Sequence, residues 1–347
     1  MDYKKILKEL VSIPAVSGFE HMSAERIKGL MEGKCDEVTI DSFFNVIGVK
    51  RGIGERPKKI IITAHYDEIG FLVKSIDENG FVSLTSMGGI DPKLLLAQEV
   101  VIHGKRDIEG VIGAKPPHLL KPEETKKAVS LEDLSVDTGF LKDELKDNVS
   151  IGDVVTIKVP FLELQGNKVS SKSMDNRSGV AAVIGIMNEL SGIKLNNDIF
   201  FVATTQEEVG LRGAQVSSYA IDPDVAVVID ACHGEMPDCP KESVFPLGKG
   251  TAIGVGPNLH RTLTKKLFDI AKDNDISHQT DIEPDNTGTE AWAIQVSRSG
   301  IPTVLVSIPL RYMHTGTETL DVADVENTVR LVKEFLTALD DGMEGIL

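Results

Sequence analysis

The sequence predicts an α/β protein in which a mostly parallel sheet, flanked by helices, is interrupted by a small β-barrel insert. After residue 170, apolar runs of strand length alternate with amphipathic helical segments, which is typical of a parallel sheet. From about residue 70 to residue 165 the chain instead holds short strands with almost no helical pattern. The apolar run at 58–65 cannot bury both of its faces alone, so it must join the later strands. We therefore expect a discontinuous α/β domain, residues 1–69 and 166–347, and a β-barrel domain, residues 70–165.

The N-terminal part supplies two helices and the first strands of the sheet. Residues 2–11 and 20–32 carry apolar side chains at helical spacing. Strand-like segments follow at 37–40, 45–52 and 58–65. The last of these reads KKIIITAH, a pattern that predicts a strand buried on both faces.

The insert is predicted from short alternating segments. Residues 71–87 resemble two strands around an Glu-Asn-Gly turn at 78–80, which favours a hairpin. Further strands are expected at 99–104, 109–114 and 153–160. Residues 115–135 are rich in proline and charge, which indicates either a mobile loop or a plain surface linker.

The last part of the chain returns to strands that alternate with helices. Strands are expected at 198–205, 224–230, 251–256 and 302–310. Helices are expected at 177–190, 262–275, 289–300 and 321–342. Each helix would pack an apolar face against the sheet, as the spacing of Val180, Ile184 and Met187 predicts for the first.

Composition and charge exclude several classes of function. The chain has 37 Lys and Arg against 53 Asp and Glu, a net charge of -16, so nucleic acid and anionic membranes are unexpected partners. The three cysteines form no CxxC pair, which argues against a thiolate zinc site and a disulfide framework. The N-terminus is a charged amphipathic segment, and no apolar run approaches the ~18 residues of a membrane span. We therefore expect a cytoplasmic protein.

Two adjacent carboxylates, Glu207 and Glu208, follow the apolar run at 199–204. Charges at a strand end are usually solvated, because burying an unpaired carboxylate is costly. In an open α/β sheet, however, ligands gather at the carboxyl ends of the strands, and several of these ends carry polar residues. The converging residues are His65, Asp67, Asp175, Glu207, Glu208, Asp230 and His314. Each has a structural explanation when taken singly, such as a helix N-cap for Asp175, and their convergence is what favours a site.

The donor types indicate a metal centre. Carboxylates mixed with imidazoles, without thiolates, suit Zn, Co or Mn. Five ligands exceed a tetrahedral site and fit two divalent ions that share one carboxylate. One of the two adjacent glutamates would bind metal while the other acts as general base. Asp67 lies two residues after His65, so it can hold the imidazole N–H and fix its tautomer.

Four motifs resemble those of the tetrahedral (TET) metallo-aminopeptidases, a family that includes glutamyl and deblocking aminopeptidases and members named endoglucanase. They are AHYDEIGF at 64–71, SKSMDNRSG at 171–179, TTQEEVGLRGA at 204–214 and YMHT at 312–315. The segment IGAKPPHLLKPEE also resembles the mobile loop of this family. The resemblance covers essentially the whole chain. It implies a zinc-peptidase-like α/β domain, a PDZ-like barrel used for dimerisation, and six dimers in a hollow dodecamer.

The resemblance also implies how the metal ligands are shared. His65, Asp175 and Asp230 would bind one ion. Asp175, Glu208 and His314 would bind the other, with Asp175 bridging the two.

Further roles follow from the same resemblance. Glu207 would be the general base, and Asp67 would orient the ligand His65. A cis peptide bond between Asp175 and Asn176 would turn the bridging carboxylate toward both ions. The chain departs from the family at Cys232, which stands where a threonine is usual, and this difference concerns the neighbouring pocket.

We therefore expect a metal-dependent aminopeptidase that acts on short peptides. A deacylase or deacetylase with the same dinuclear centre is the main alternative. A glycoside hydrolase needs paired carboxylates without metal, and one Trp and four Tyr are few for a polysaccharide platform. A non-catalytic scaffold disagrees with the full ligand set. The preferred N-terminal residue, the native metal and the choice between dimer and dodecamer stay open.

Overall fold

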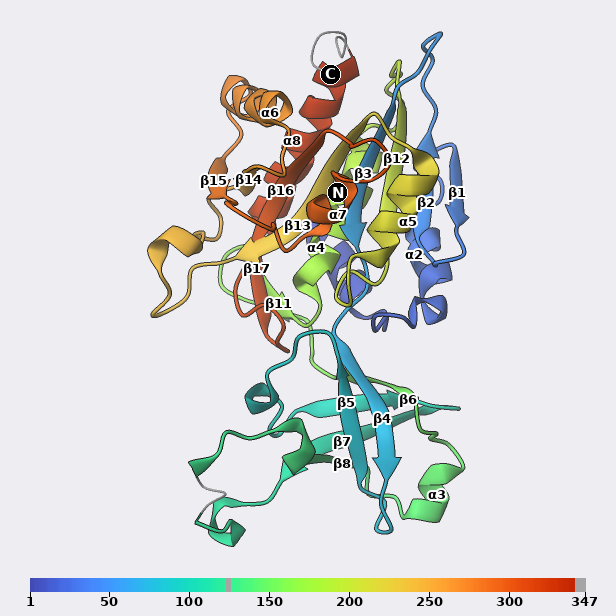
Figure 1. Ribbon diagram of the computed structural model, residues 1–347, viewed down its shortest axis with the longest axis vertical. Helices are drawn as coiled ribbons and strands as arrows, with labels where there is room; N and C mark the ends of the chain where they lie inside the picture. The colour runs from blue at the N-terminus through green and yellow to red at the C-terminus, as the bar shows by residue number, and fades with distance from the viewer. Residues whose placement is uncertain (123–125, 341–347) are drawn as a thin grey trace.

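The computed structural model describes residues 1–122 and 126–340. Its largest sheet has eight strands in the order β1-β2-β12-β3-β13-β16-β14-β15 (Figure 1). Their bounds are β1 Glu37–Ile40, β2 Val46–Lys50, β12 Asp198–Thr204, β3 Lys59–His65, β13 Val225–His233, β16 Thr303–Leu310, β14 Thr251–Val255 and β15 His278–Ile282. Pairing is parallel from β12 through β3 and β13 to β16, and again between β14 and β15. The predicted α/β class with a mostly parallel sheet is confirmed.

Helices cover both faces of this sheet, which explains why its central strands carry apolar side chains on both faces. One face packs against α1 Tyr3–Val11, α2 Ala24–Met31, α4 Met174–Glu189, α6 Arg261–Asp273 and α8 Val322–Asp340. The other face packs against α5 Arg212–Ile221 and α7 Glu290–Ile294. Within β3, Ile60 and Ile62 join the first core and Ile61 joins the second, as alternating side chains require. Among the described residues, no helix combines the length and apolar character that a membrane span requires.

The insert forms a closed barrel in the order β4-β5-β8-β7-β6-β9, and all its pairs are antiparallel. The strands are β4 Gly70–Ile76, β5 Val82–Met87, β8 Leu134–Asp137, β7 Asp107–Ala114, β6 Glu99–His103 and β9 Val154–Ile157. Alternate side chains such as Val100 and Ile102 fill a core that is separate from those of the sheet. Figure 1 shows the barrel beside the main sheet rather than woven into it. The predicted barrel insert is confirmed.

Several elements differ from the sequence-based expectation. Helix α7 is much shorter than the predicted 289–300, since it ends at Ile294. Arg298 adopts a φ of 57°, which a right-handed helix does not allow, so a helix could not have continued to residue 300. Strand β13 continues to His233, so Asp230 lies inside the strand rather than at its end. The expected loop 115–135 ends in β8, since Leu134 enters the barrel core. Residues 123–125 of that loop lie outside the described residues.

A small antiparallel sheet was absent from the prediction. It consists of β10 Leu162–Glu163, β11 Lys168–Ser171 and β17 Glu318–Asp321, in that order. Its register sets Ser171 opposite Glu318. Strand β11 leads directly into α4, so this sheet brings the segment after β16 close to the start of that helix.

Candidate metal centre

The predicted site residues meet at one edge of the main sheet. Strands β12, β3, β13 and β16 are neighbours and run in parallel, so their carboxyl ends share that edge. Loops after three of these strands and the first turn of α4 complete the cluster. The residues brought together are His65, Asp67, Asp175, Glu207, Glu208, Asp230 and His314.

Asp175 lies between two sets of potential ligand atoms. Its Oδ1 is 3.2 Å from Nε2 of His65, and its Oδ2 is 3.4 Å from Nε2 of His314. On the first side, Oδ1 of Asp230 is 3.8 Å from Nε2 of His65. On the second side, Oε2 of Glu208 is 3.4 Å from Nε2 of His314. In each set of three, the ligand atoms lie within 4.8 Å of one another, and Asp175 belongs to both sets.

The backbone at Asp175 has the geometry that the resemblance implies. The peptide bond between Asp175 and Asn176 is cis. The Asn176 side chain donates to the carbonyl oxygen of Ile229 at 2.8 Å and accepts from the Gly179 N–H at 2.9 Å. Asn176 is fully buried, so these bonds tie the start of α4 to the strand that carries Asp230.

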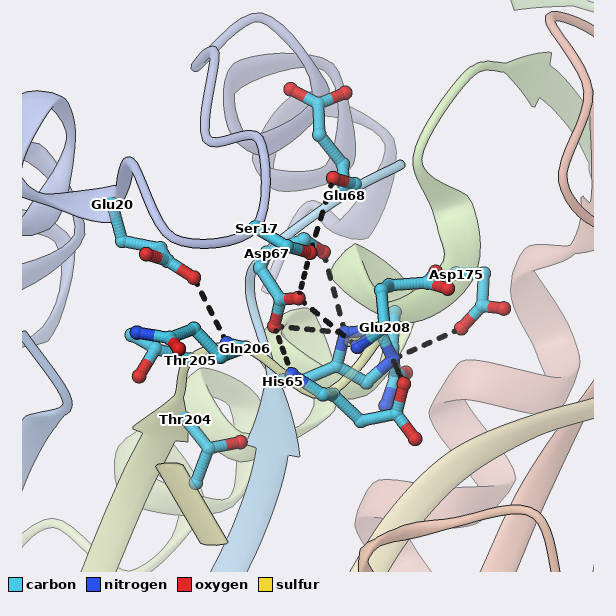
Figure 2. Close-up of polar contacts among 12 residues, drawn as sticks. Ser17, Glu20, His65, Asp67, Glu68, Asp175, Thr204, Thr205, Gln206 and Glu208 are labelled. Atoms are coloured by element: carbon cyan, nitrogen blue, oxygen red, sulfur yellow. Dashed lines mark hydrogen bonds and ion pairs between the residues drawn. The ribbon is translucent and has the colours of Figure 1, made fainter. Parts of the chain in front are cut away.

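Asp67 organises the loop that holds the two glutamates, as Figure 2 shows. Its carboxylate accepts the backbone N–H groups of Glu207 at 3.0 Å and Glu208 at 3.2 Å, and the hydroxyl of Ser17. Nδ1 of His65 lies 3.3 Å from the backbone oxygen of Asp67 and 3.5 Å from its Oδ1. Asp67 therefore fixes the imidazole on one side and the direction of the glutamate loop on the other.

Glu318 is a functional candidate that the sequence prediction missed. Its Oε2 accepts the backbone N–H of Asp175 at 3.0 Å, and its Oε1 accepts that of His314 at 2.8 Å. Burial, and then the charge of Asp175, raises the pKa of Glu318 to about 8. One carboxylate thus links two candidate ligands that are 139 positions apart in the numbering, and only the pairing of β11 with β17 brings it there.

A buried ion network supports the same region from the N-terminal side. Glu68 accepts the backbone N–H of Ala15 at 3.0 Å and pairs with the ammonium of Lys172. Arg177, also fully buried, lies 4.0 Å from Glu68 and donates to the carbonyl oxygen of Leu10 at 2.7 Å. Both Lys172 and Arg177 flank Asp175 in sequence, so the network connects the N-terminal segment to the start of α4.

The electrostatics of the cluster fit divalent cations. Burial raises the pKa of Asp230 well above its usual range. Burial likewise raises the pKa of Glu207 to about 10, with Asp230 adding to the effect and His65 opposing it. Hydrogen bonds to Asp175 and Glu208 raise the pKa of His314 to about 11. The cluster therefore holds more buried carboxylates than its two imidazoles can neutralise. Divalent cations bound to the oxygen and nitrogen donors would supply the missing positive charge.

A cavity of about 630 Å³ opens onto the cluster. One wall carries the candidate ligands and Glu207. Cys232, the departure noted in the sequence, is buried and lies in the wall beyond Asp230. Much of the remaining lining comes from the segment after β13 and from β15 and the residues that follow it.

Comparisons of the sequence with known proteins identify aminopeptidases as relatives. The family model of the M42 glutamyl aminopeptidases matches residues 45–331. The lysyl aminopeptidase of Pyrococcus furiosus is 34% identical over 340 residues, which cover 96% of this chain and 97% of that protein.

Solved structures extend the similarity to the fold. The TET1 peptidase of Pyrococcus horikoshii, described as assembling into a tetrahedron or a large octahedral shell, is 33% identical with a TM-score of 0.84 over 98% of this chain and 99% of that one. A Thermotoga maritima protein described as an endoglucanase is 31% identical with a TM-score of 0.77, over 96% of this chain and 98% of that one.

Proposed function

Because this chain belongs to the M42 glutamyl aminopeptidase family, whose members hydrolyse peptides at the N-terminal residue, we propose that it releases N-terminal residues from short peptides at a centre of two divalent metal ions. The observation that carries the proposal is the position of Asp175. It directs one carboxylate oxygen toward each imidazole of the cluster, at 3.2 Å and 3.4 Å, as a ligand shared by two ions would.

We assign the ligands in two sets. His65, Asp175 and Asp230 would hold one ion, and Asp175, Glu208 and His314 the other. Zn, Co and Mn all suit this mixture of carboxylate and imidazole donors. When bound, the ions supply Lewis acidity toward the scissile carbonyl.

Glu207 is the proposed general base. It lines the cavity, and its Oε2 lies 3.9 Å from Nε2 of His65. It belongs to neither of the two sets that share Asp175, although it forms a third close group with His65 and Glu208. It would take a proton from the attacking water and return one to the nitrogen of the departing amine as the C–N bond breaks. Asp67 would position this base, since it accepts the Glu207 N–H and contacts His65.

We further propose that residues 70–165 are a dimerisation domain on the discontinuous domain of residues 1–69 and 166–347, in a cytoplasmic enzyme. A closed object with tetrahedral rotational symmetry holds twelve equivalent subunits, so the tetrahedron described for the Pyrococcus horikoshii relative supports dimers that assemble into a dodecamer. Light scattering of the purified chain tests this, and a monomer at micromolar concentration would contradict it.

One panel of substrates tests the activity itself. Metal-depleted protein receives Zn, Co or Mn and is offered aminoacyl anilides, an N-acetylated amino acid and a soluble cellulose derivative. Cleavage of the free-amine anilides alone, restored by a dication, supports the aminopeptidase. Preference for the acylated substrate would identify a deacylase with the same centre. Chelator-resistant cleavage of the polysaccharide would identify a glycoside hydrolase.

A further inference from the structure

The lining of the cavity carries three acids besides the candidate ligands and Glu207. They are Glu242, in the segment after β13, and Asp281 and Glu283, at the end of β15. No lysine or arginine is among the described residues that line the cavity. The substrate-facing surface is therefore acidic well beyond the residues needed for metal binding.

Asp281 and Glu283 are placed for a ligand rather than for the fold. They are two positions apart on an extended segment, so their side chains point to the same side, and both line the cavity. Within the described part of the chain, neither carboxylate has a hydrogen bond or ion pair to another side chain, and His233 is the one group whose charge opposes the raised pKa of Asp281. Burial, and then the charge of Asp281, raises the pKa of Glu283 to about 7. Burial and mutual repulsion make these two carboxylates unfavourable for folding, so the stability of the fold does not explain their presence.

The same cavity can also accept an aliphatic stem. Phe245, from the segment after β13, and Met313, from the segment after β16, both line it. Long basic side chains pack their methylene groups on apolar surface while the charged end reaches a polar partner. The combination of an apolar wall with unpaired carboxylates matches a side chain of this shape.

Resting on the proposed function, we infer that this cavity receives the side chain of the substrate's N-terminal residue and selects a basic one, lysine or arginine, through Asp281 and Glu283. A neutral side chain of the same length would fill the stem region and leave both carboxylates unpaired. An acidic side chain would meet like charges. Glu242 is exposed and would add a longer-range attraction rather than a direct contact.

The decisive test compares lysyl, arginyl, norleucyl and glutamyl anilides. Norleucine keeps the stem of lysine without the ammonium. The native enzyme should cleave the lysyl and arginyl substrates about 10- to 100-fold more efficiently in kcat/KM than the norleucyl one, as expected for a charge-assisted contact, and the glutamyl substrate least. The double variant Asp281→Asn with Glu283→Gln should lose this preference while keeping its rate on the norleucyl substrate, which also reports that it folds.

Asp285→Asn is the matched control. Asp285 is exposed, lies two residues after Glu283 and does not line the cavity. Its replacement removes one of the two charges that the double variant removes, and it should leave the preference unchanged. Equal rates on lysyl and norleucyl substrates, or a preference that survives the double variant, would overturn the inference.

A binding measurement separates this inference from the proposed function. Calorimetry compares lysinamide with norleucinamide on the native protein and the double variant. If no anilide is cleaved with any metal, the proposed function fails, yet tighter binding of lysinamide that the double variant abolishes still supports the acidic pocket. Equal binding of the two amides overturns it whether or not the protein cleaves anilides.

Discussion

The barrel buries almost no polar side chains, whereas the edge of the sheet that carries the candidate ligands buries several. Within the described residues of 70–165, Thr156 is the one polar side chain that is buried, and it contacts His103 at 2.9 Å. The edge of the sheet buries His65, Asp175, Asp230 and Glu318 within one small region. The barrel interior is thus almost wholly apolar, as packing alone requires. The edge of the sheet buries ionisable side chains, and this burial costs free energy unless hydrogen-bond partners, opposite charges or bound cations compensate. The difference separates function from stability more clearly than any single residue does.

The largest expected effect lies at the edge. Glu207→Gln keeps the shape of the side chain and removes the base, so it should retain its metal and lose ~10²–10⁴-fold in kcat. Glu208→Gln should instead lower the metal content. Mass spectrometry of metal content and turnover on the same preparations check both, and the reverse pattern would exchange the two assignments.

The buried ion network should show the next largest effect. Glu68→Gln leaves Lys172 and Arg177 without their carboxylate, and breaking a buried pair in this way costs about 3–5 kcal/mol of unfolding free energy. Denaturant unfolding measures it. A cost below about 1 kcal/mol would mean that water reaches the network and screens its charges, although the side chains are buried in the structure.

A core substitution in the barrel should separate stability from chemistry. Ile102 is fully buried there, and Ile102→Ala should cost about 2–4 kcal/mol of stability through lost packing. Metal content and kcat of the folded fraction should stay at native values. If metal is lost in proportion to stability, the barrel core and the site are one cooperative unit rather than two.

The smallest effect is expected from an ion pair on the surface of the barrel. The substitution is again Glu to Gln in a pair with lysine, so it differs from the Glu68 test mainly in burial. Glu109 pairs with Lys158 at 2.7 Å, and both side chains are substantially exposed. Glu109→Gln should change stability by no more than about 0.5 kcal/mol, because solvent screens such a pair. The same unfolding assay measures it, and a cost approaching that of Glu68→Gln would remove the contrast between the two regions.

The sequence predicts the parts of the fold that rest on local patterns. Strand β3 and helix α4 follow directly from runs and periods of apolar residues, and the barrel follows from the change in period at residue 70. Strand β15 was not predicted, because HQTDI is polar and lies at the edge of the sheet with little buried surface. Helix α5 was missed for a similar reason, since its buried face is built mostly from Gly213, Ala214 and serines, with Ile221 as its one large apolar side chain.

The site shows the same limit. Its predicted ligands lie next to recognisable strand ends, so their convergence could be inferred from topology. Glu318, in contrast, binds through its carboxylate to backbone N–H groups of distant residues, and such a contact leaves no pattern in the sequence. Asp281 and Glu283 are likewise ordinary acids until β15 pairs with β14 and turns them toward the cavity.

Two chain connections join the barrel to segments that carry candidate metal ligands. Strand β4 begins at Gly70, immediately after the segment that carries His65 and Asp67. The chain that leaves β9 passes through β10 and β11 of the small sheet, and β11 leads into α4 and Asp175. Gly70 also packs tightly, since a Cβ there would lie 2.4 Å from Val16. Replacement of the barrel by another domain during evolution would therefore be expected to disturb the candidate site. A chimaera with a different barrel must preserve both connections. Mutations that alter the surface of the barrel and mutations that alter the candidate site are therefore expected to be selected together.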